Sequence, residues 1–463
     1  VRARIFSGTK LPGDITTGTY FINERNFTLP VVSVSTTPAN LTDNTIGIYV
    51  QGTNGITGNG MNSPANWNQD WDRPVNFELF DANKVLQLSQ EVDVNIAGGW
   101  TRMNGQKSLK INPKKKFGNN LLNYDFFAAT KPRMKYKSIL LRNSGNDFYY
   151  SMLRDGYMNE LVRNRMNIDY IAYEPAICFM NGVYYGIQNI RERSDVDYIY
   201  SNYGLDEDKI KLLESWEQNS DTSYTRVSNY ITGNDITNGS VYANVGTMID
   251  LESFINYHLT QIYYGNTDWP HNNNKIWKKR DNGKWRWILY DTDFGFSLYN
   301  TTLYNHNTLL HALSEVSTDP PASWSTIVLK RLLMNDTFKK RFVSSFCIHM
   351  SSTFNENRAN AILDSMAARI ATEINYHKTK WPSYRAFSTD IANMKTFSAN
   401  RPIYMMNFLS SRLMASATPK IINISSNHTK ASYTFNDVVI SDANINLRYF
   451  NNQDITLKAN NIP

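Results

Sequence analysis

The sequence predicts a mixed α+β fold with two lobes, a β-rich N-terminal lobe and a helical C-terminal lobe, with partial β modules at both ends. Three observations carry this prediction. Short alternating strands separated by Gly, Asn and Pro fill the first part of the chain, apolar residues recur at helical spacing from Asp250 onward, and alternating strands return after Thr418. Runs of strands followed by runs of helices are typical of α+β proteins.

Composition narrows the functional class of this 463-residue chain, which carries a net charge of +7. Its basic residues are scattered and no RNA- or DNA-binding signature accompanies them, so we expect no nucleic-acid partner. Two cysteines exclude a disulfide framework and a Cys-based zinc site. No apolar run is long enough for a transmembrane segment. The polar, aromatic composition favours an extracellular, cell-surface or periplasmic monomer, although this chain has no visible signal peptide.

The N-terminal half alternates between strands and turns. Residues 1–29 are predicted to be the tail of a truncated β domain. The Gly- and Asn-rich stretch Gly52–Asn68 predicts a mobile loop. The dipeptide Asn181–Gly182 predicts a tight hairpin turn within Ile177–Ile190. Further strands are predicted at Leu29–Val34, Val75–Phe80 and Val92–Ile96.

The C-terminal half is predicted to be mostly helical, interrupted by a short hairpin that turns at Asp281–Gly283. Residues 416–463 are predicted to form a small or incomplete β module. Apolar spacing predicts helices at Asp147–Asn164, Ser325–Met350, Asn357–Ile374 and Arg401–Met414.

Asp268 and Asn273 form the first pattern that indicates chemistry. They lie five residues apart, in the segment Asn266–Lys275. Protein kinases use this spacing between the aspartate that orients the acceptor hydroxyl and an asparagine that binds magnesium. The alternative is an Asn- and Asp-rich surface loop, which is common in a chain this rich in asparagine.

A second pattern follows about twenty residues later. The apolar run Trp285–Tyr290 predicts a buried strand that ends in Asp291 and Asp293, and Gly295 permits a tight turn. Two carboxylates at the end of a buried strand are costly unless a cation or hydrogen-bond donors compensate them. Either aspartate could face a metal ion, and we favour Asp291 because it directly follows the apolar run.

Three weaker patterns lie upstream. Gly98 and Gly99 lie between two strands, where backbone amides can approach phosphates, and Lys107 on the returning strand can neutralise them. An ordinary hairpin with a solvated lysine explains the same residues. Arg142 ends an apolar strand in the segment Leu141–Asp147, where Asp147 could simply cap a helix. Glu192 ends another strand, where it could reach a ligand or pair with a neighbouring arginine.

Taken together, these segments resemble the spore-coat protein kinase H (CotH kinase) family over roughly residues 30–415. The order of the motifs carries the resemblance: Gly-Gly, Gln-Lys-Ser, Leu-Arg-Asn-Ser-Gly-Asn-Asp, Gly-Val-Tyr-Tyr-Gly-Ile, Asn-x-Asp-Trp and Trp-x-Trp-Ile-x-x-Asp-x-Asp-Phe-Gly. One departure is Ala97-Gly98-Gly99, since family members often have a histidine before the glycines, and this departure concerns the nucleotide contacts more than the magnesium ligands.

The resemblance implies a divergent, two-lobed protein-kinase-like fold. It also implies transfer of the γ-phosphoryl group of ATP to Ser or Thr of a secreted or coat protein, with Mg²⁺ (or Mn²⁺) as cofactor. By this resemblance Asp268 is the catalytic base, and Asn273 with Asp291, or alternatively Asp293, binds the metal. The flanking Asn272 and Asn274 leave the position of the asparagine ligand open by one residue. The nucleotide contacts would come from Gly98, Gly99, Lys107, Arg142 and Glu192.

Two other functions fit the sequence. A kinase-like surface protein could have lost or repurposed the site for adhesion or glycan binding, which the flanking β modules and the composition favour. The sequence keeps Lys107, Asp268, Asn273 and Asp291 together, which argues against loss of the phosphotransfer site. An enzyme of this fold could also transfer another group, such as AMP.

Overall fold

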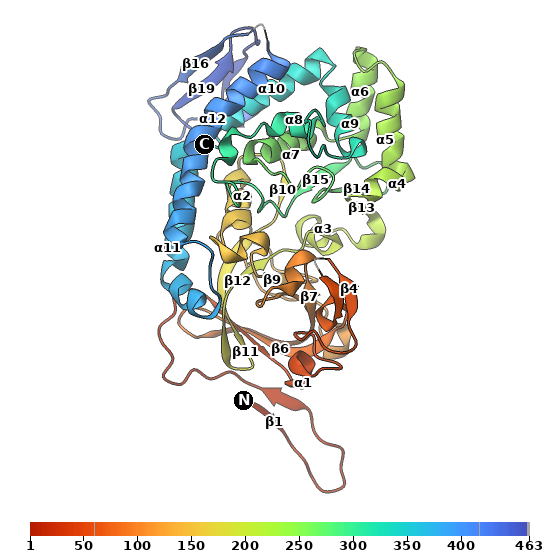
Figure 1. Cartoon of the computed structure of the whole chain (residues 1–463), viewed down its shortest axis with the longest axis vertical. Coiled ribbons are helices and arrows are strands. Elements are labelled where there is room, and N and C mark those ends of the chain that lie inside the picture. Colours follow the sequence, from red (N-terminus) through yellow and green to blue (C-terminus); the bar gives the residue numbers. More distant parts are fainter. Residues whose placement is uncertain (60, 416, 461–463) are drawn as a thin grey trace. The chain divides into compact units, whose positions relative to one another are not determined.

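The computed structural model describes residues 1–59, 61–415 and 417–460. The chain divides into two compact units, each described here by itself (Figure 1). The barrel unit comprises Val1–Met152, Ala172–Gly204 and Met366–Tyr384, and the helical unit comprises Leu153–Ile171, Leu205–Ser365 and Arg385–Pro463. The predicted α+β class is confirmed, whereas the kinase-like arrangement of two lobes stays a prediction, as do the domain boundaries near residues 29 and 416.

A closed barrel forms the centre of the barrel unit, a closure that the sequence did not predict (Figure 1). Alternating apolar side chains such as Val32, Phe77 and Leu109 fill its interior, because successive side chains of a strand point to opposite faces. Strand β11 closes the barrel by pairing in parallel with β3, and the other pairs are antiparallel. In spatial order the strands are β11 (Tyr173–Met180), β12 (Val183–Arg191), β9 (Ile139–Arg142), β8 (Ser108–Asn112), β7 (Leu86–Ala97), β6 (Arg73–Phe80) and β3 (Val31–Ser35).

The predicted hairpin turn at Asn181–Gly182 is confirmed. Both residues have positive φ, 49° and 77°, which is the backbone that Asn and Gly tolerate in a two-residue turn. By contrast, a small hairpin forms within Gly52–Asn68, where the sequence predicted a mobile loop. Its strands are β4 (Ile56–Gly58) and β5 (Met61–Ala65), and the buried Asn66 amide donates to the carbonyls of Asn44 and Gly47 at 3.1 Å. Residue 60 lies outside the described residues.

The other elements of the barrel unit are short. Strands β1 (Arg2–Arg4) and β2 (Ile15–Thr17) pair with each other within residues 1–29. Helix α1 spans Ala39–Thr42, and α3 (Val196–Tyr203) begins where Asp195 accepts a hydrogen bond from the backbone of Asp197.

The helical unit is built on a four-stranded sheet in the order β10 (Asp169–Tyr170), β15 (Arg286–Leu289), β14 (Lys275–Lys279) and β13 (Ile210–Glu214). Strands β14 and β15 are the hairpin predicted around Asp281–Gly283. The surrounding helices are α2 (Arg154–Val162), α4 (Glu217–Ser220), α5 (Thr222–Gly233), α6 (Gly239–Met248), α7 (Leu251–Tyr264), α8 (Thr308–Ala312), α9 (Ser323–Leu332), α10 (Asp336–Ser351) and α12 (Phe387–Leu413) (Figure 1).

Helix boundaries depart from the predictions where side chains cap them. The single helix predicted over Ser325–Met350 is wrong, because the side chain of Asn335 accepts a hydrogen bond from the backbone of Phe338 and starts α10 there. Helix α12 begins well before the predicted Arg401 and continues through Pro402. Helix α11 (Glu356–Lys380) extends the helix predicted to end at Ile374.

The predicted C-terminal strands are confirmed and belong to the helical unit. They pack on α10, where Tyr449 donates its hydroxyl to Ser344 at 2.9 Å and the backbone amide of Arg448 donates to Ser351 at 3.0 Å. The strands are β16 (Pro419–Ile424) paired with β19 (Ile445–Phe450), and β17 (Tyr433–Phe435) between β18 (Val438–Ile440) and β20 (Leu457–Ala459).

Candidate active site

Asp268 lies in a turn that directly follows α7, and buried polar groups hold this turn in place. Helix α7 ends at Gly265, whose φ of 69° provides the left-handed termination typical of helix C-termini. The amide of Asn266 then donates to Gln261 at 2.9 Å, and the side-chain oxygen of Asn266 accepts the backbone N–H of Asp268 at 3.1 Å. The turn therefore has the fixed backbone that a catalytic carboxylate needs.

A buried arginine on α12 supports the same helix end. The guanidinium of Arg401 is fully buried and donates to the carbonyls of Ile262 and Tyr263, at 2.7 and 2.9 Å. These are among the last carbonyls of α7, which have no partner inside the helix. Arg401 thus supplies hydrogen-bond donors to the C-terminal carbonyls of α7, the helix that precedes Asp268.

The carboxylate of Asp268 is enclosed by two asparagine amides. Asn273 donates to one carboxylate oxygen at 2.8 Å, and Asn272 donates to the other at 3.0 Å. Burial raises the pKa of Asp268 above its ordinary value, and the nearby negative charge of Asp291 raises that pKa further, whereas the two amides oppose the shift. The pair predicted from spacing, Asp268 and Asn273, is therefore in direct contact.

Strand pairing brings Asp291 to this turn. In the β14–β15 ladder Lys275 lies opposite Ile288, so the residues just before Lys275 lie opposite those just after Leu289. Asn274, the other alternative for the asparagine ligand, is buried, and its amide donates to the carbonyl of Pro270 at 3.2 Å. Asn274 therefore has a structural role, and Asn272 and Asn273 are the asparagines that face Asp268.

The turn after β15 is fixed by Asp155 on α2. Both the backbone N–H and the hydroxyl of Thr292 donate to one oxygen of Asp155 at 3.0 Å. A side chain at Gly295 would place its Cβ 2.8 Å from the carbonyl of Tyr264, so only glycine fits this close approach. Asp291 is half-buried with a φ of 51°, whereas Asp293 is fully buried. The accessible Asp291 is the better placed of the two to meet a ligand.

The oxygen groups of this turn suit a hard divalent cation. Magnesium prefers carboxylate and amide oxygens with water completing its shell. Asn273 uses its amide nitrogen on Asp268, so its amide oxygen is the atom that it could offer to a cation. Among the described residues, the structure contains no group of three or more His, Cys, Asp or Glu side chains that could hold a metal ion. The residues here that could hold such an ion are Asn273, through its amide oxygen, and Asp291, through its carboxylate.

In the barrel unit, Gly98 and Gly99 connect β7 to β8 as predicted. Gly98 has a φ of 95°, and Arg102 fastens the loop by donating to its carbonyl at 2.5 Å. Lys107 is 3% exposed, and its ammonium donates to the carbonyls of Arg102 and Asn104 at 2.5 and 3.0 Å. Burial lowers the pKa of Lys107 to about 8.

Glu192 pairs with a lysine that the sequence analysis did not single out. Lys131 donates to Glu192 at 2.8 Å, and both side chains are buried. Further donors to Glu192 include the backbone N–H of Ala172 at 2.9 Å and the amide of Asn202 at 2.7 Å.

Lys107 lies away from Glu192 along strand β12. The side-chain amide of Gln188 donates to the carbonyl of Lys107 at 2.8 Å, so Lys107 lies beside a residue four positions before Glu192. Four residues of strand span about 13 Å. Arg142 ends β9 opposite Asn189. One end of the sheet therefore carries Lys107, Arg142 and the two glycines. Glu192 lies in another part of the sheet.

The comparison with protein families shows which family this chain belongs to. The family model described as CotH kinase protein matches residues 94–405, which is more than half of the chain. This chain belongs to the CotH kinase family. A search of curated proteins found no match. Membership of the CotH kinase family indicates a kinase-like function, and the matched range includes every residue of the two patterns around Asp268 and Asp291.

Two supporting residues of this member of the CotH kinase family lacked any clear sequence signal. Lys131 lies in an irregular segment with no motif, and Asp155 lies 137 residues before its partner Thr292. Both act through contacts between distant parts of the chain. Within residues 1–59, 61–415 and 417–460, none of the helices has the length and apolar character needed to cross a membrane.

Proposed function

We propose that this protein is an ATP- and magnesium-dependent kinase that transfers the γ-phosphoryl group to Ser or Thr of a secreted or surface protein. Family membership supports phosphotransfer in general. The observation that carries the specific proposal is the Asp268–Asn273 pair beside the charge of Asp291. In this proposal the barrel unit corresponds to the β-rich lobe of a kinase, and the helical unit to its helical lobe.

Asp268 would act on the acceptor hydroxyl. A carboxylate on a rigid turn can orient a serine or threonine hydroxyl and accept its proton as phosphoryl transfer proceeds. The asparagine amides that contact Asp268 fix the direction of its oxygens. The raised pKa of Asp268 strengthens it as a base relative to an ordinary aspartate.

Asn273 and Asp291 would hold the magnesium ion. A magnesium or manganese ion held there would supply positive charge against the charge that develops on the transferred group. Asp155 holds Thr292, and this fixes the backbone next to Asp291. The carboxylate of Asp291 therefore does not need to become ordered when an ion binds. The roles of Asp293 as an alternative ligand and of Arg142 near the nucleotide stay predictions.

The ion pair in the barrel unit supports a revised choice of phosphate-contacting lysine. Kinases place a lysine that contacts phosphates in an ion pair with a glutamate. Lys131 has this partner in Glu192, whereas Lys107 donates to backbone carbonyls of its own loop. We therefore favour Lys131 for this role, and Lys107 for holding the Gly98–Gly99 loop.

Transfer of label from ATP to a generic acceptor protein tests this function. Label from the γ position should transfer, and Asp268→Ala and Asp291→Ala should abolish that transfer. Asp208→Ala changes an exposed aspartate of the same unit and serves as the matched control. Transfer of label from the α position would instead identify AMP transfer, and γ-label transfer that survives both substitutions would exclude this site.

A further inference from the structure

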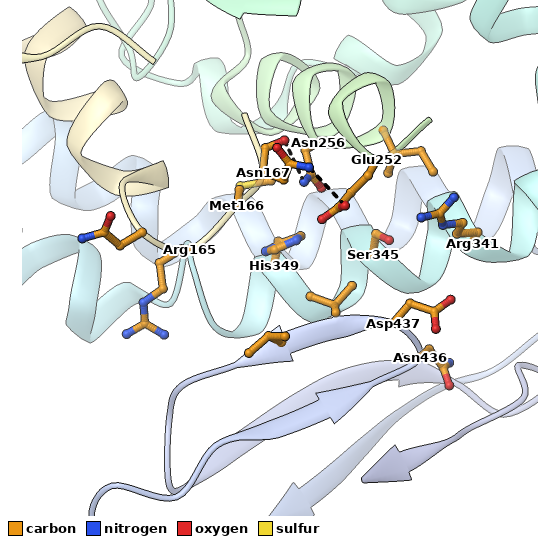
Figure 2. Close-up of a pocket in the computed structure, with 14 residues that line it drawn as sticks. Arg165, Met166, Asn167, Glu252, Asn256, Arg341, Ser345, His349, Asn436 and Asp437 are labelled. Carbon is orange, nitrogen blue, oxygen red and sulfur yellow. Dashed lines mark hydrogen bonds between the residues drawn. The ribbon is translucent and has the colours of Figure 1, made fainter. Parts of the chain in front are cut away.

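The helical unit contains a cavity of about 270 Å³ that no part of the proposed phosphotransfer uses. Helix α7 and helix α10 form its walls, the segment 164–167 closes one side, and the turn between β17 and β18 covers it (Figure 2). Its volume lies near the lower end of the ~300–1,000 Å³ typical of small-molecule sites. The cavity therefore has room for one small ligand.

The deep part of this cavity carries polar but uncharged groups. Asn256, Ser345 and His349 line it and are only 4%, 5% and 2% exposed (Figure 2). His349 is bonded to Thr353 through Nδ1 at 2.9 Å, and Asn256 donates its amide to the carbonyl of Asn167 at 3.3 Å. The printed hydrogen bonds of Asn256 and His349 use Asn256 Nδ2 and His349 Nδ1, so Asn256 Oδ1, His349 Nε2 and the hydroxyl of Ser345 are the atoms that these residues can offer to the cavity.

These three atoms are the groups that a ligand would satisfy. Polar atoms that line an accessible cavity can form hydrogen bonds to water, and a ligand that displaces this water must replace those bonds. A hydroxyl both donates and accepts, an amide oxygen accepts, and a neutral imidazole nitrogen does one or the other. Together they match a ligand with several hydroxyl groups.

Charged groups lie at the rim of the cavity and are of both signs. Glu252 and Asp437 are exposed, and Arg341 is half-buried. Arg165 is already paired with Asp442, at 2.7 and 3.1 Å. Burial lowers the pKa of His349 to about 3, so its ring is neutral at physiological pH. The Arg165 cation lies close enough to lower the pKa of His349 further, but Arg165 is paired with Asp442, so the deep part offers a charged ligand a paired cation and a neutral ring.

Aliphatic side chains complete the lining. Ile255 comes from α7, and Val438 and Val439 come from strand β18. Sugar rings combine hydroxyl groups at their edge with apolar C–H surfaces, so a lining of neutral polar groups and aliphatic groups complements both parts of such a ring.

The cover of the cavity is held in place before any ligand binds. Asn436, in the turn, donates to the hydroxyls of Ser344 and Tyr449 at 3.2 and 2.7 Å. Tyr449 in turn donates to Ser344 on α10 at 2.9 Å. A site held in its binding geometry loses less entropy when it binds a ligand.

We propose that this cavity binds an uncharged, hydroxyl-rich ligand of the size of a single sugar ring. The inference does not depend on the phosphotransfer site, since it shares no residue with Asp268, Asn273 or Asp291. It gives the C-terminal β strands a function, because their turn forms the cover of the site. Carbohydrate on a surface or on an acceptor glycoprotein is the source of such a ligand.

Calorimetry and thermal shift with the full chain test this proposal. The probes are neutral monosaccharides (glucose, galactose, mannose and N-acetylglucosamine), with glycine, phosphate and spermidine as charged comparisons. We expect at least one sugar to bind and raise the unfolding temperature, and the charged probes to leave it unchanged. Ser345→Ala should weaken sugar binding about fivefold, since one hydrogen bond is lost.

Two further variants keep the test decisive. Ser345→Leu fills the cavity and should abolish sugar binding, whereas Ser411→Ala, at an exposed hydroxyl on α12, should leave it unchanged. Asp268→Ala should also bind sugar normally, which separates this proposal from the kinase proposal. Binding of no sugar by a folded wild-type chain, or sugar binding that persists in Ser345→Leu, overturns the inference, as does preferential binding of a charged probe.

Discussion

Replacing Lys131 with methionine removes the cation from a buried ion pair and leaves Glu192 behind. The side chains of Lys131 and Glu192 are 9% and 2% exposed, so water cannot replace the lost ammonium. Breaking a buried pair by removing one partner costs about 3–5 kcal/mol of unfolding free energy. Glu192 keeps two donors, the N–H of Ala172 and the amide of Asn202, which places the expected cost near 3 kcal/mol, at the low end of that range.

Lys395→Met provides the matched control. Lys395 pairs with Asp364 at 2.6 Å, but the two side chains are 37% and 56% exposed. Exposed pairs contribute about 0–1 kcal/mol, so this variant should differ little from wild type. The double variant Lys131→Met/Glu192→Gln should regain part of the stability that Lys131→Met loses, because no unpaired buried charge remains.

Amide hydrogen exchange measures this loss where it occurs. The chain has two compact units, so one global unfolding curve does not report on the barrel unit alone. The amides of β12 should exchange faster in Lys131→Met than in the wild type. The factor of this increase should correspond to the unfolding free energy that the substitution removes. If Lys131→Met perturbs β12 no more than Lys395→Met does, the reasoning about this buried pair is refuted.

Three other predictions concern the site and its surroundings. Gly295→Ala should lower the unfolding temperature, because its Cβ would lie 2.8 Å from the carbonyl of Tyr264, whereas Gly233→Ala, with no atom within 4 Å of the added Cβ, should not. Because the pKa of Asp268 is raised, the acidic limb of the kcat/KM profile should fall above the ~3.9 of an ordinary aspartate, and a limb at or below that value would contradict its role as base. The pKa of Lys107 is lowered to about 8, so the unfolded chain binds more protons than the folded chain above that pH. Unfolding free energy should therefore rise with pH from about 8 toward the ~10.4 of a free lysine, and Lys107→Met should remove that rise in denaturant titrations.

Local patterns allowed the helical part of the site to be predicted from sequence. The spacing of Asp268 and Asn273 is set within one turn, and the apolar run before Asp291 is the strand that delivers it. A hairpin turn between β14 and β15 fixes their register, so the two patterns come together through short-range pairing. These features depend on neighbours in sequence, which pattern analysis can read.

The features that the sequence did not reveal depend on distant contacts. Barrel closure needs the parallel pairing of Val31–Val34 with Ile177–Met180, and no local pattern specifies which distant strand closes a barrel. Glu192 and Lys131 are 61 residues apart, and the lysine lies in a segment without periodicity. The break between α9 and α10 depends on one capping side chain, Asn335, within an otherwise continuous apolar pattern. Tertiary context decided each of these outcomes.

The most direct test of the account is a crystal structure of the protein with Mg²⁺ and a non-hydrolysable ATP analogue. The account predicts a magnesium ion bound by the amide oxygen of Asn273 and the carboxylate of Asp291, with the terminal phosphate next to Asp268. A metal–nucleotide complex bound elsewhere on the chain, with Asn273 and Asp291 making no contact to it, would contradict the central claim.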